Sequence, residues 1–412
     1  MFVDWMQSNA LGGARALGGV LLGAFSVQAL ASTVGSESSV GLSADYDSNP
    51  YLLASGPRSA ESAALVASLP VSYNDNAVAM DLSVRSRLAE SHGPLAVLSN
   101  YEYFDGDWKF SGERSALAAN VGWHRDSTLY NQYENTALQG HSVIRQESSA
   151  QLDGSRQLDE RATVRVSGSY NQVNFDQIAG QLVTNYHYEQ LGAQIERTLS
   201  ELWQGSASLG VGRYELPDHS FREDTRYAQL GVNRALNENW LFSSQLGYSR
   251  LADRSQFQVA YLALAPDGTL EILQRPVILH HQGGTTSYAL SLQRNTERAQ
   301  WSVAASRSVQ PSGLGSLLTQ DSVTLSRAGD LSERSRVTVT LGGSRNDDSL
   351  QHLQLGNRRY FQVASTWSWR ASEQWVIDTE LSANRQRVNG EQADGLTVRI
   401  SLLRQLRRWR IK

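Results

Sequence analysis

The sequence has 412 residues, of which 19% are charged and 40% are hydrophobic, and its formal net charge is −4. The even composition argues against several domains joined by Pro-rich or charged linkers, and the weakly acidic balance gives no attraction to nucleic acid. Because the chain has no Cys, disulfides and thiolate chemistry are excluded.

The first 31 residues have the pattern of a secretory signal peptide. An apolar run at 16–30 follows Arg15, and Ala29-Leu30-Ala31 provides a small-x-small cleavage site. The alternative is a membrane anchor, but a run of roughly 15 residues is short of the about 20 that a helical span needs. We therefore expect a signal peptide at 1–31 and a single domain at 32–412.

Alternation of apolar and small polar residues predicts eighteen strands in the mature chain, because a period of two turns successive side chains to opposite faces of a sheet. In 203–214, for example, Leu209 and Val211 alternate with Ser208 and Gly210. The predicted strands are 39–46, 63–73, 77–88, 98–110, 115–125, 142–154, 161–171, 185–198, 203–214, 225–236, 240–251, 286–295, 300–309, 321–328, 334–346, 358–370, 374–388 and 396–406.

The connections between these strands alternate in length. Short polar turns, often preceded by Arg and followed by Trp, follow the even-numbered strands, and longer loops follow the odd-numbered ones; the longest is predicted at 252–283. Closing such a sheet removes its edges, and short turns at one rim with longer loops at the other are typical of bacterial outer-membrane barrels. The expected fold is all-β, a single transmembrane up-and-down antiparallel β-barrel of about 18 strands.

Four tryptophans begin strands directly after short turns: Trp203, Trp240, Trp301 and Trp375. Equivalent positions would place all four at one membrane–water boundary, where an amphipathic ring is favoured. The alternative is that strand-opening tryptophans pack in a soluble core.

Two segments and the recurring Leu-Ser-Glu turns carry a family resemblance. Asp45-Tyr-Asp-Ser-Asn-Pro-Tyr-Leu52 and Ser306-Arg-Ser-Val-Gln-Pro-Ser-Gly-Leu-Gly315 resemble the β-barrel porin family of Gram-negative outer membranes, some of whose members accompany exopolysaccharide-biosynthesis and PEP-CTERM protein-sorting systems. The resemblance implies outer-membrane lipid and the barrel assembly machinery as partners, and no catalytic signature. Such barrels commonly end in Phe, whereas this chain ends in Arg-Ile-Lys412; either Trp409 is the substitute, or the basic tail extends beyond the last strand.

If the apolar face meets lipid, the opposite face lines the lumen. The candidate lumen residues are Asp81, Arg85, Arg87, Arg165, Glu196, Arg336, Arg370, Asp378, Glu380 and Arg399. Both signs of charge are present, which predicts a polar lumen without a strong ion preference. The alternative is that these charges pair across the lumen and fill it.

The sequence offers little evidence for catalysis, a cofactor or a metal. His280 and His281 lack nearby carboxylates at ligand spacing, no Gly-x-Ser-x-Gly motif occurs, and His124 falls on the polar face. Three functions remain as hypotheses. The leading one is a non-enzymatic channel for a polysaccharide or another polar solute, followed by a closed scaffold barrel plugged by the loop at 252–283, and by an outer-membrane hydrolase with a Ser–His pair near the outer girdle.

Overall fold

The computed structural model describes residues 34–35, 38–92, 100–128, 143–176, 183–264, 270–348, 358–388 and 390–406. The predicted signal peptide and Trp409 therefore lie outside the described residues. The strands are β1 (Val34–Gly35), β2 (Ser39–Asp47), β3 (Ala60–Asn74), β4 (Val78–His92), β5 (Tyr101–Ser111), β6 (Ser115–Ser127), β7 (Ile144–Gln157), β8 (Ala162–Phe175), β9 (Tyr186–Thr198), β10 (Trp203–Glu215), β11 (Phe221–Asn237), β12 (Trp240–Leu264), β13 (Leu270–Asn295), β14 (Ala299–Pro311), β15 (Leu317–Ser332), β16 (Ser335–Asp348), β17 (Arg358–Arg370), β18 (Trp375–Val388) and β19 (Glu391–Gln405).

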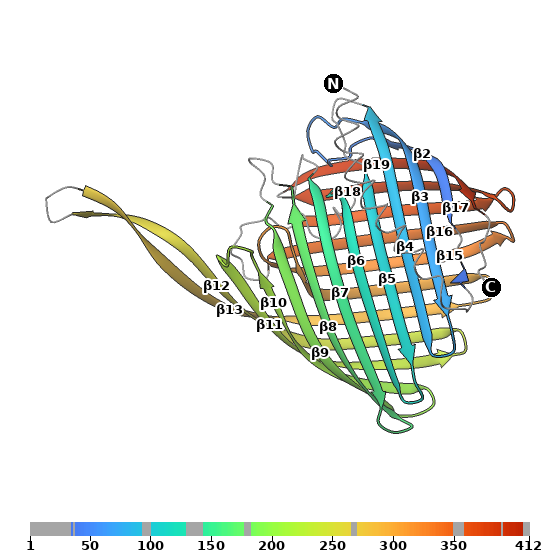
Figure 1. Cartoon of the computed structure of the whole chain (residues 1–412), viewed down its shortest axis with the longest axis horizontal. Coiled ribbons are helices and arrows are strands. Elements are labelled where there is room, and N and C mark those ends of the chain that lie inside the picture. Colours follow the sequence, from blue (N-terminus) through green and yellow to red (C-terminus); the bar gives the residue numbers. More distant parts are fainter. Residues whose placement is uncertain are drawn as a thin grey trace.

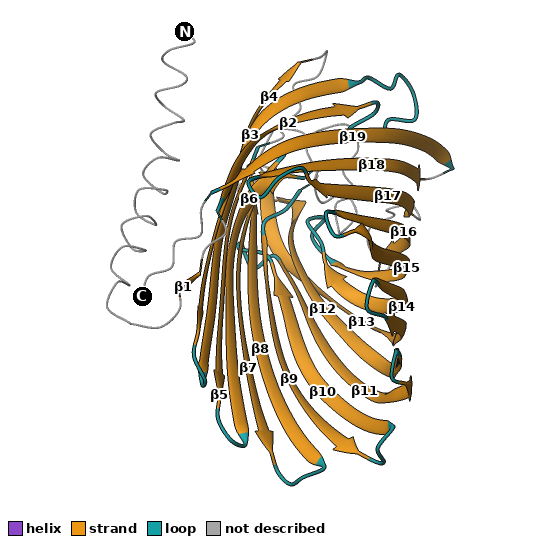
Figure 2. Cartoon of the chain, turned by 90° about the vertical axis from the view of Figure 1, so that its right-hand side faces the viewer, coloured by secondary structure: helices purple, strands orange, loops and turns teal. Residues whose placement is uncertain are grey.

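From β2 onward each strand pairs antiparallel with the next, and β19 pairs with β2 from Thr397↔Asp47 to Gln405↔Ser39. The sheet is thus a closed barrel (Figures 1 and 2). The short β1 pairs with Ser72 and Tyr73 of β3, beyond the segment that β2 occupies, so it continues the β2 position in the wall. The prediction of an up-and-down barrel of 18 strands is confirmed. Within the described residues, no helix is long and apolar enough to cross a membrane.

Large apolar side chains cover one face of the wall. Leu230 of β11 and Leu246 of β12 lie directly opposite each other and are 70% and 62% exposed. Leu42, Leu65 and Leu88 form a similar row across β2, β3 and β4. A contiguous apolar surface of this extent is unfavourable in water and is what a lipid-facing band requires.

The prediction of a loop at 252–283 is wrong. β12 and β13 stay paired from Trp240↔Arg294 to Leu264↔Leu270, and their outer part extends away from the barrel as a long hairpin (Figure 1). The β13–β14 ladder stops at Tyr288↔Arg307, so β13 has a free edge in the hairpin. Pro276 lies within β13 beside this free edge, where proline is tolerated in a strand.

The two faces of one strand provide a test of the lipid-facing assignment. We expect Leu152→Arg on the exposed apolar face of β7 to lower the free energy of unfolding in phospholipid vesicles by about 2–4 kcal/mol, because a guanidinium near the bilayer midplane is poorly solvated. Gln151→Arg on the opposite face is the control and should have little effect. Equal effects of the two variants, measured by urea titration, would contradict the assignment.

Candidate functional site: the inner wall and its loops

All ten candidate lumen residues project to the face opposite the exposed apolar side chains. Asp81, for instance, lies between Ser72 and Asp107 in the ladder, whereas the neighbouring Leu82 faces Gly106 on the apolar side. The same alternation continues without a break around the closed sheet, because each cross-strand pair shares a face. The strand positions on this inner face carry mainly hydroxyl, amide, glycine and charged residues.

Asp45 is the centre of an ionic network that crosses neighbouring strands. Its carboxylate pairs with Arg87 of β4 and Arg399 of β19, and it accepts a hydrogen bond of 2.9 Å from the Ser62 hydroxyl. Arg399 also pairs with Glu380 of β18 at 3.1 Å. The side chain of Arg87 is only 2% exposed, so this guanidinium depends on Asp45 for charge compensation.

A second group of charges lies on β4 to β7. Asp105 contacts Arg85 at 2.9 Å and His124 at 2.7 Å. Farther along the wall, Arg145 pairs with Asp126 at 3.1 Å and with Glu147 at 3.2 Å. These contacts run along the wall between neighbouring strands and do not bridge the barrel.

The remaining predicted residues divide into paired and unpaired charges. Arg165 contacts Glu196 at 3.1 Å, and Arg336 lies 3.7 Å from Asp330. Within the described part of the chain, Asp81, Arg370 and Asp378 make no ion pair. These three lie close to the short-turn ends of β4, β17 and β18.

The connection between β14 and β15 folds into the barrel. The Tyr214 hydroxyl of β10 donates to the Ser312 carbonyl at 2.9 Å, and the Glu223 carboxylate of β11 accepts from the Leu317 amide at 3.1 Å. The Thr184 amide, which precedes β9, donates to the Gly313 carbonyl at 2.8 Å. Because β12 and β13 separate β11 from β14 in the wall, these contacts require the loop, residues 312–316, to cross the interior.

An apolar cluster supports this loop at the long-loop end of the barrel. Tyr186 and Tyr214 stack with ring centroids 5.1 Å apart, and Leu317 is fully buried. The other members are Val143, Val173, Phe175, Val183 and Leu251. Gly313 packs against Phe175, and a Cβ there would come within 2.7 Å of the ring. The close approach therefore requires glycine.

The connection between β2 and β3 also folds onto the inner face. Leu52 packs on Tyr360 of β17 and Ala393 of β19, with a positive φ of 46°. The side-chain amide of Asn49 donates to the carbonyls of Leu53 and Asp394, each at 3.0 Å. Burial raises the pKa of the hydroxyl of Tyr51, the residue before Leu52, above its usual value.

Sequence reasoning missed that these two loops shape the interior. Each loop overlaps one of the segments that carry the family resemblance, 45–52 and 306–315. The available signals were the Pro311 and Gly313 turn residues and the Asn49-Pro50 turn. These signals predict turns but do not specify whether a loop folds inward or outward.

The four predicted girdle tryptophans all contact arginine at the short-turn rim. Arginine lies over the ring, with its guanidinium carbon 4.6 to 5.9 Å from the centroid, in the pairs Trp203–Arg234, Trp240–Arg294, Trp301–Arg327 and Trp375–Arg404. Each arginine is the direct cross-strand neighbour of its tryptophan. Such pairs combine an amphipathic ring with a cation that favours lipid phosphate.

Three histidine side chains of the described residues form contacts with carboxylates. His219 lies 2.5 Å and His187 3.5 Å from Glu215, and His124 contacts Asp105. In the described ranges, no three His, Cys, Asp or Glu side chains are grouped closely enough to hold a metal ion.

A closed antiparallel barrel with an outward apolar band and a polar inner face defines the class of protein. Only such a closed sheet satisfies all backbone groups of spanning strands in lipid. This protein is a bacterial outer-membrane β-barrel.

No protein-family model and no curated protein matches the sequence. Solved structures do match. The ferric-catecholate import receptor Fiu of E. coli aligns over 90% of this chain and 82% of its own at 9% identity and a TM-score of 0.46. Two Pseudomonas aeruginosa proteins, OccK5 (OpdH) and OccK2 (OpdF) in complex with glucuronate, align over 90% of this chain and 98% of theirs, at 11% and 12% identity and TM-scores of 0.45 and 0.43. The class of this protein rests on its own topology and surface.

The Asp45 network yields one testable consequence. Asp45→Asn removes the carboxylate beside the buried Arg87, and we expect it to destabilise the barrel by about 3 kcal/mol or more in urea unfolding. Asp394→Asn is the control, because its pair with Arg385 is exposed and should contribute little. If both variants unfold at the same urea concentration, the network is not structural.

The packing of Gly313 against Phe175 yields a second testable prediction. Gly313→Val forces a Cβ against Phe175, and we expect it to displace the loop and cost about 1–3 kcal/mol. Chymotrypsin should then cleave after Leu314 in the refolded barrel and leave the wild type intact. Gly342→Val is the control, because a Cβ there meets nothing within 4 Å. Resistance of the Gly313 variant to cleavage would count against the inward loop.

Proposed function

We propose that this protein is a non-enzymatic outer-membrane channel for polar solutes. The observation that supports it is the continuous polar inner face of eighteen strands, whose charged side chains mostly pair with neighbours along the wall. Pairing along the wall leaves the lumen to water, whereas pairing across it would fill the space. A barrel of 16–18 strands is wide enough for an aqueous passage.

The inward loop at 312–316 is the element that we propose narrows this passage. It is attached to β10 and β11 by Tyr214 and Glu223, far along the wall from its own strands. The loop at 48–59 lines the wall on β17 and β19 through Leu52. Both loops belong to the end that carries the longer connections, which in outer-membrane barrels is the extracellular end.

The unpaired inner charges suggest where ion preference would arise. Asp81 and Asp107 lie directly opposite each other near the short-turn rim, with Arg370 and Asp378 at the same end of other strands. Two adjacent carboxylates favour cations locally. The ten charges named from the sequence are, in this proposal, lumen-lining residues, and the four rim tryptophans are the membrane girdle.

The solute class is the finer part of the proposal. A polysaccharide is suggested by the resemblance of segments 45–52 and 306–315 to barrels that accompany exopolysaccharide systems. Both segments contain parts of the inward loops, so the resemblance falls on elements that would contact a passing chain. The barrel assembly machinery is the partner that this class of protein implies.

A closed scaffold barrel is the second candidate. It is favoured by the β12–β13 hairpin, whose outer part has open strand edges and extends away from the wall (Figure 1). Exposed edges are sites where another chain adds a strand. In this alternative the barrel anchors the hairpin and conducts nothing.

Single-channel recording in planar bilayers separates the two candidates. We expect the wild type to conduct, and replacement of residues 312–316 by a two-residue turn to raise the conductance severalfold, because that loop occupies the cross-section. Removal of residues 256–278 from the hairpin is the control and should leave conductance unchanged. Silence of both the wild type and the loop variant, after a heat-modifiable gel shift has confirmed folding, would favour the scaffold.

A further inference from the structure

The outward face of β11 and β12 carries two cross-strand pairs of arginine near the long-loop end. Arg222 lies directly opposite Arg254, and Arg226 directly opposite Arg250. Asp224 lies between the two pairs and faces Ala252. Like charges placed directly opposite each other in a sheet are destabilising unless an anion compensates them.

The described carboxylates compensate only part of this charge. Asp224 accepts four contacts of 2.8 to 3.2 Å from Arg222 and one of 3.1 Å from Arg213. Arg250 donates to the amide oxygen of Gln282 at 2.7 Å. Within the described residues, Arg226 and Arg254 form no ion pair.

Two further carboxylates face outward nearby. Glu189 lies opposite Arg213, and Glu215 opposite Arg222, but Glu215 is in contact with His187 and His219. Neither is a cross-strand neighbour of Arg226, Arg250 or Arg254. Three exposed guanidiniums therefore lack a carboxylate of their own.

The position of these arginines along the strand matches a membrane boundary. Arg226 and Arg222 lie eight and twelve residues before Arg234, which contacts the rim tryptophan Trp203. At about 3.3 Å per residue and a tilt of about 40°, they lie about 20 and 30 Å above that rim. An apolar band about 25 Å tall ends between these heights, so Arg222 and Arg254 lie beyond its end and Arg226 and Arg250 just within it, from where long guanidinium side chains reach the headgroups of the opposite leaflet.

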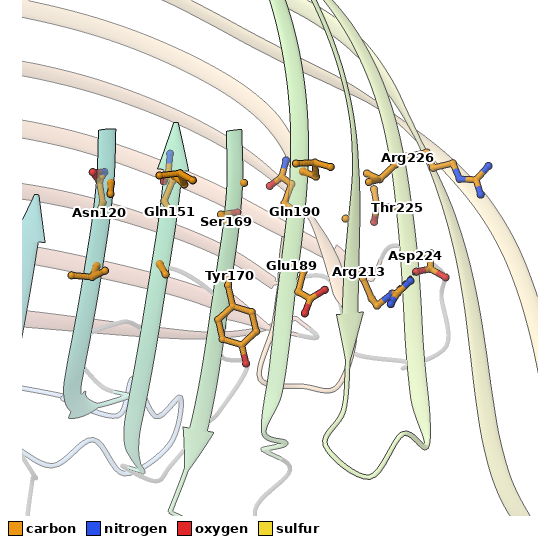
Figure 3. A pocket seen from close by; sticks show the side chains of 18 of the residues that line it. Asn120, Gln151, Ser169, Tyr170, Glu189, Gln190, Arg213, Asp224, Thr225 and Arg226 are labelled. Carbon is orange, nitrogen blue, oxygen red and sulfur yellow. Dashed lines mark hydrogen bonds and ion pairs between the residues drawn. The ribbon is translucent and has the colours of Figure 1, made fainter. Parts of the chain in front are cut away.

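A groove of about 890 Å³ on the same face adjoins the cluster (Figure 3). Its outward side chains include Arg213 and Arg226 at one end and Leu191 and Leu152 towards the other, with Gly168 between the leucines in the register. Leu152 lies five residues from the short-turn end of β7. Arg226 lies eleven residues from the short-turn end of β11. The apolar end therefore lies about 15 Å deeper in the membrane than the charged end.

We propose that this surface binds a phosphorylated lipid of the outer leaflet, with phosphate on Arg226, Arg250 and Arg254 and an acyl chain along the groove. Guanidinium is the side-chain cation best suited to phosphate, which it binds with two parallel hydrogen bonds. The apolar end of the groove continues into the hydrocarbon region, which excludes a soluble phosphate compound as the preferred ligand. The site depends on the outer-membrane location and not on whether the barrel conducts.

Lipid binding to the refolded full-length barrel tests the proposal. The probes are lipid A bearing two phosphates and the same lipid after enzymatic removal of both, each titrated in detergent and followed by native mass spectrometry. We expect the phosphorylated lipid to bind on the order of tenfold or more tightly than the dephosphorylated one, and the triple variant Arg226→Gln, Arg250→Gln, Arg254→Gln to abolish this preference.

Two further variants separate the site from general surface charge. Arg385→Gln removes an outward arginine that already pairs with Asp394, and it should bind as the wild type does. Gly168→Leu, where a Cβ meets only ordinary contacts at 3.9 Å, fills the groove and should weaken binding while keeping the phosphate preference. A heat-modifiable gel shift establishes that each variant has folded. Equal binding of the two lipids to the wild type, or an unchanged preference in the triple variant, would overturn the proposal.

Discussion

The structure depends on the requirement that every backbone N–H and C=O within lipid be hydrogen-bonded by the protein itself. An open sheet leaves one edge unsatisfied at each side, so the ladder from β2 to β19 must close, and it does so through Thr397↔Asp47 to Gln405↔Ser39. Closure in turn divides the residues of every strand into a lipid face and an inner face. The period of two then assigns each side chain to one solvent or the other.

The charges are arranged differently on the two sides of this wall. On the inner face most charged side chains have a partner on a neighbouring strand, as in Arg87–Asp45 and Arg145–Asp126. On the outward face, Trp–Arg pairs lie at the short-turn rim, ion pairs such as Arg307–Asp321 lie farther along the strands, and the arginine cluster of β11 and β12 lies near the long-loop end. Arginine pairs with carboxylates on both faces, and the outward Arg226, Arg250 and Arg254 are the ones that we propose for phosphate.

The inward loops connect the fold to the proposed function. A wall of strands alone sets only a diameter, and the contacts of Tyr214 with Ser312 and of Leu52 with Tyr360 add material to the inner face. Those contacts join residues far apart in the sequence, since the first pair is separated by 98 positions. The outer part of the β12–β13 hairpin, by contrast, extends away from the wall and leaves the interior unobstructed by that segment.

Local sequence determined the class of fold, the number of strands and the face of each residue, because alternation and turn chemistry are properties of neighbouring residues. It therefore also placed Arg87 and Arg399 on the same face as Asp45. Only the tertiary structure decided that these three side chains meet, because closure brings the first and last strands of the barrel together. It alone decided that 312–316 folds inward and that 252–283 forms a paired hairpin. Turn residues such as Gly313 do not specify the direction of a loop, which depends on the available partner strands and packing surfaces.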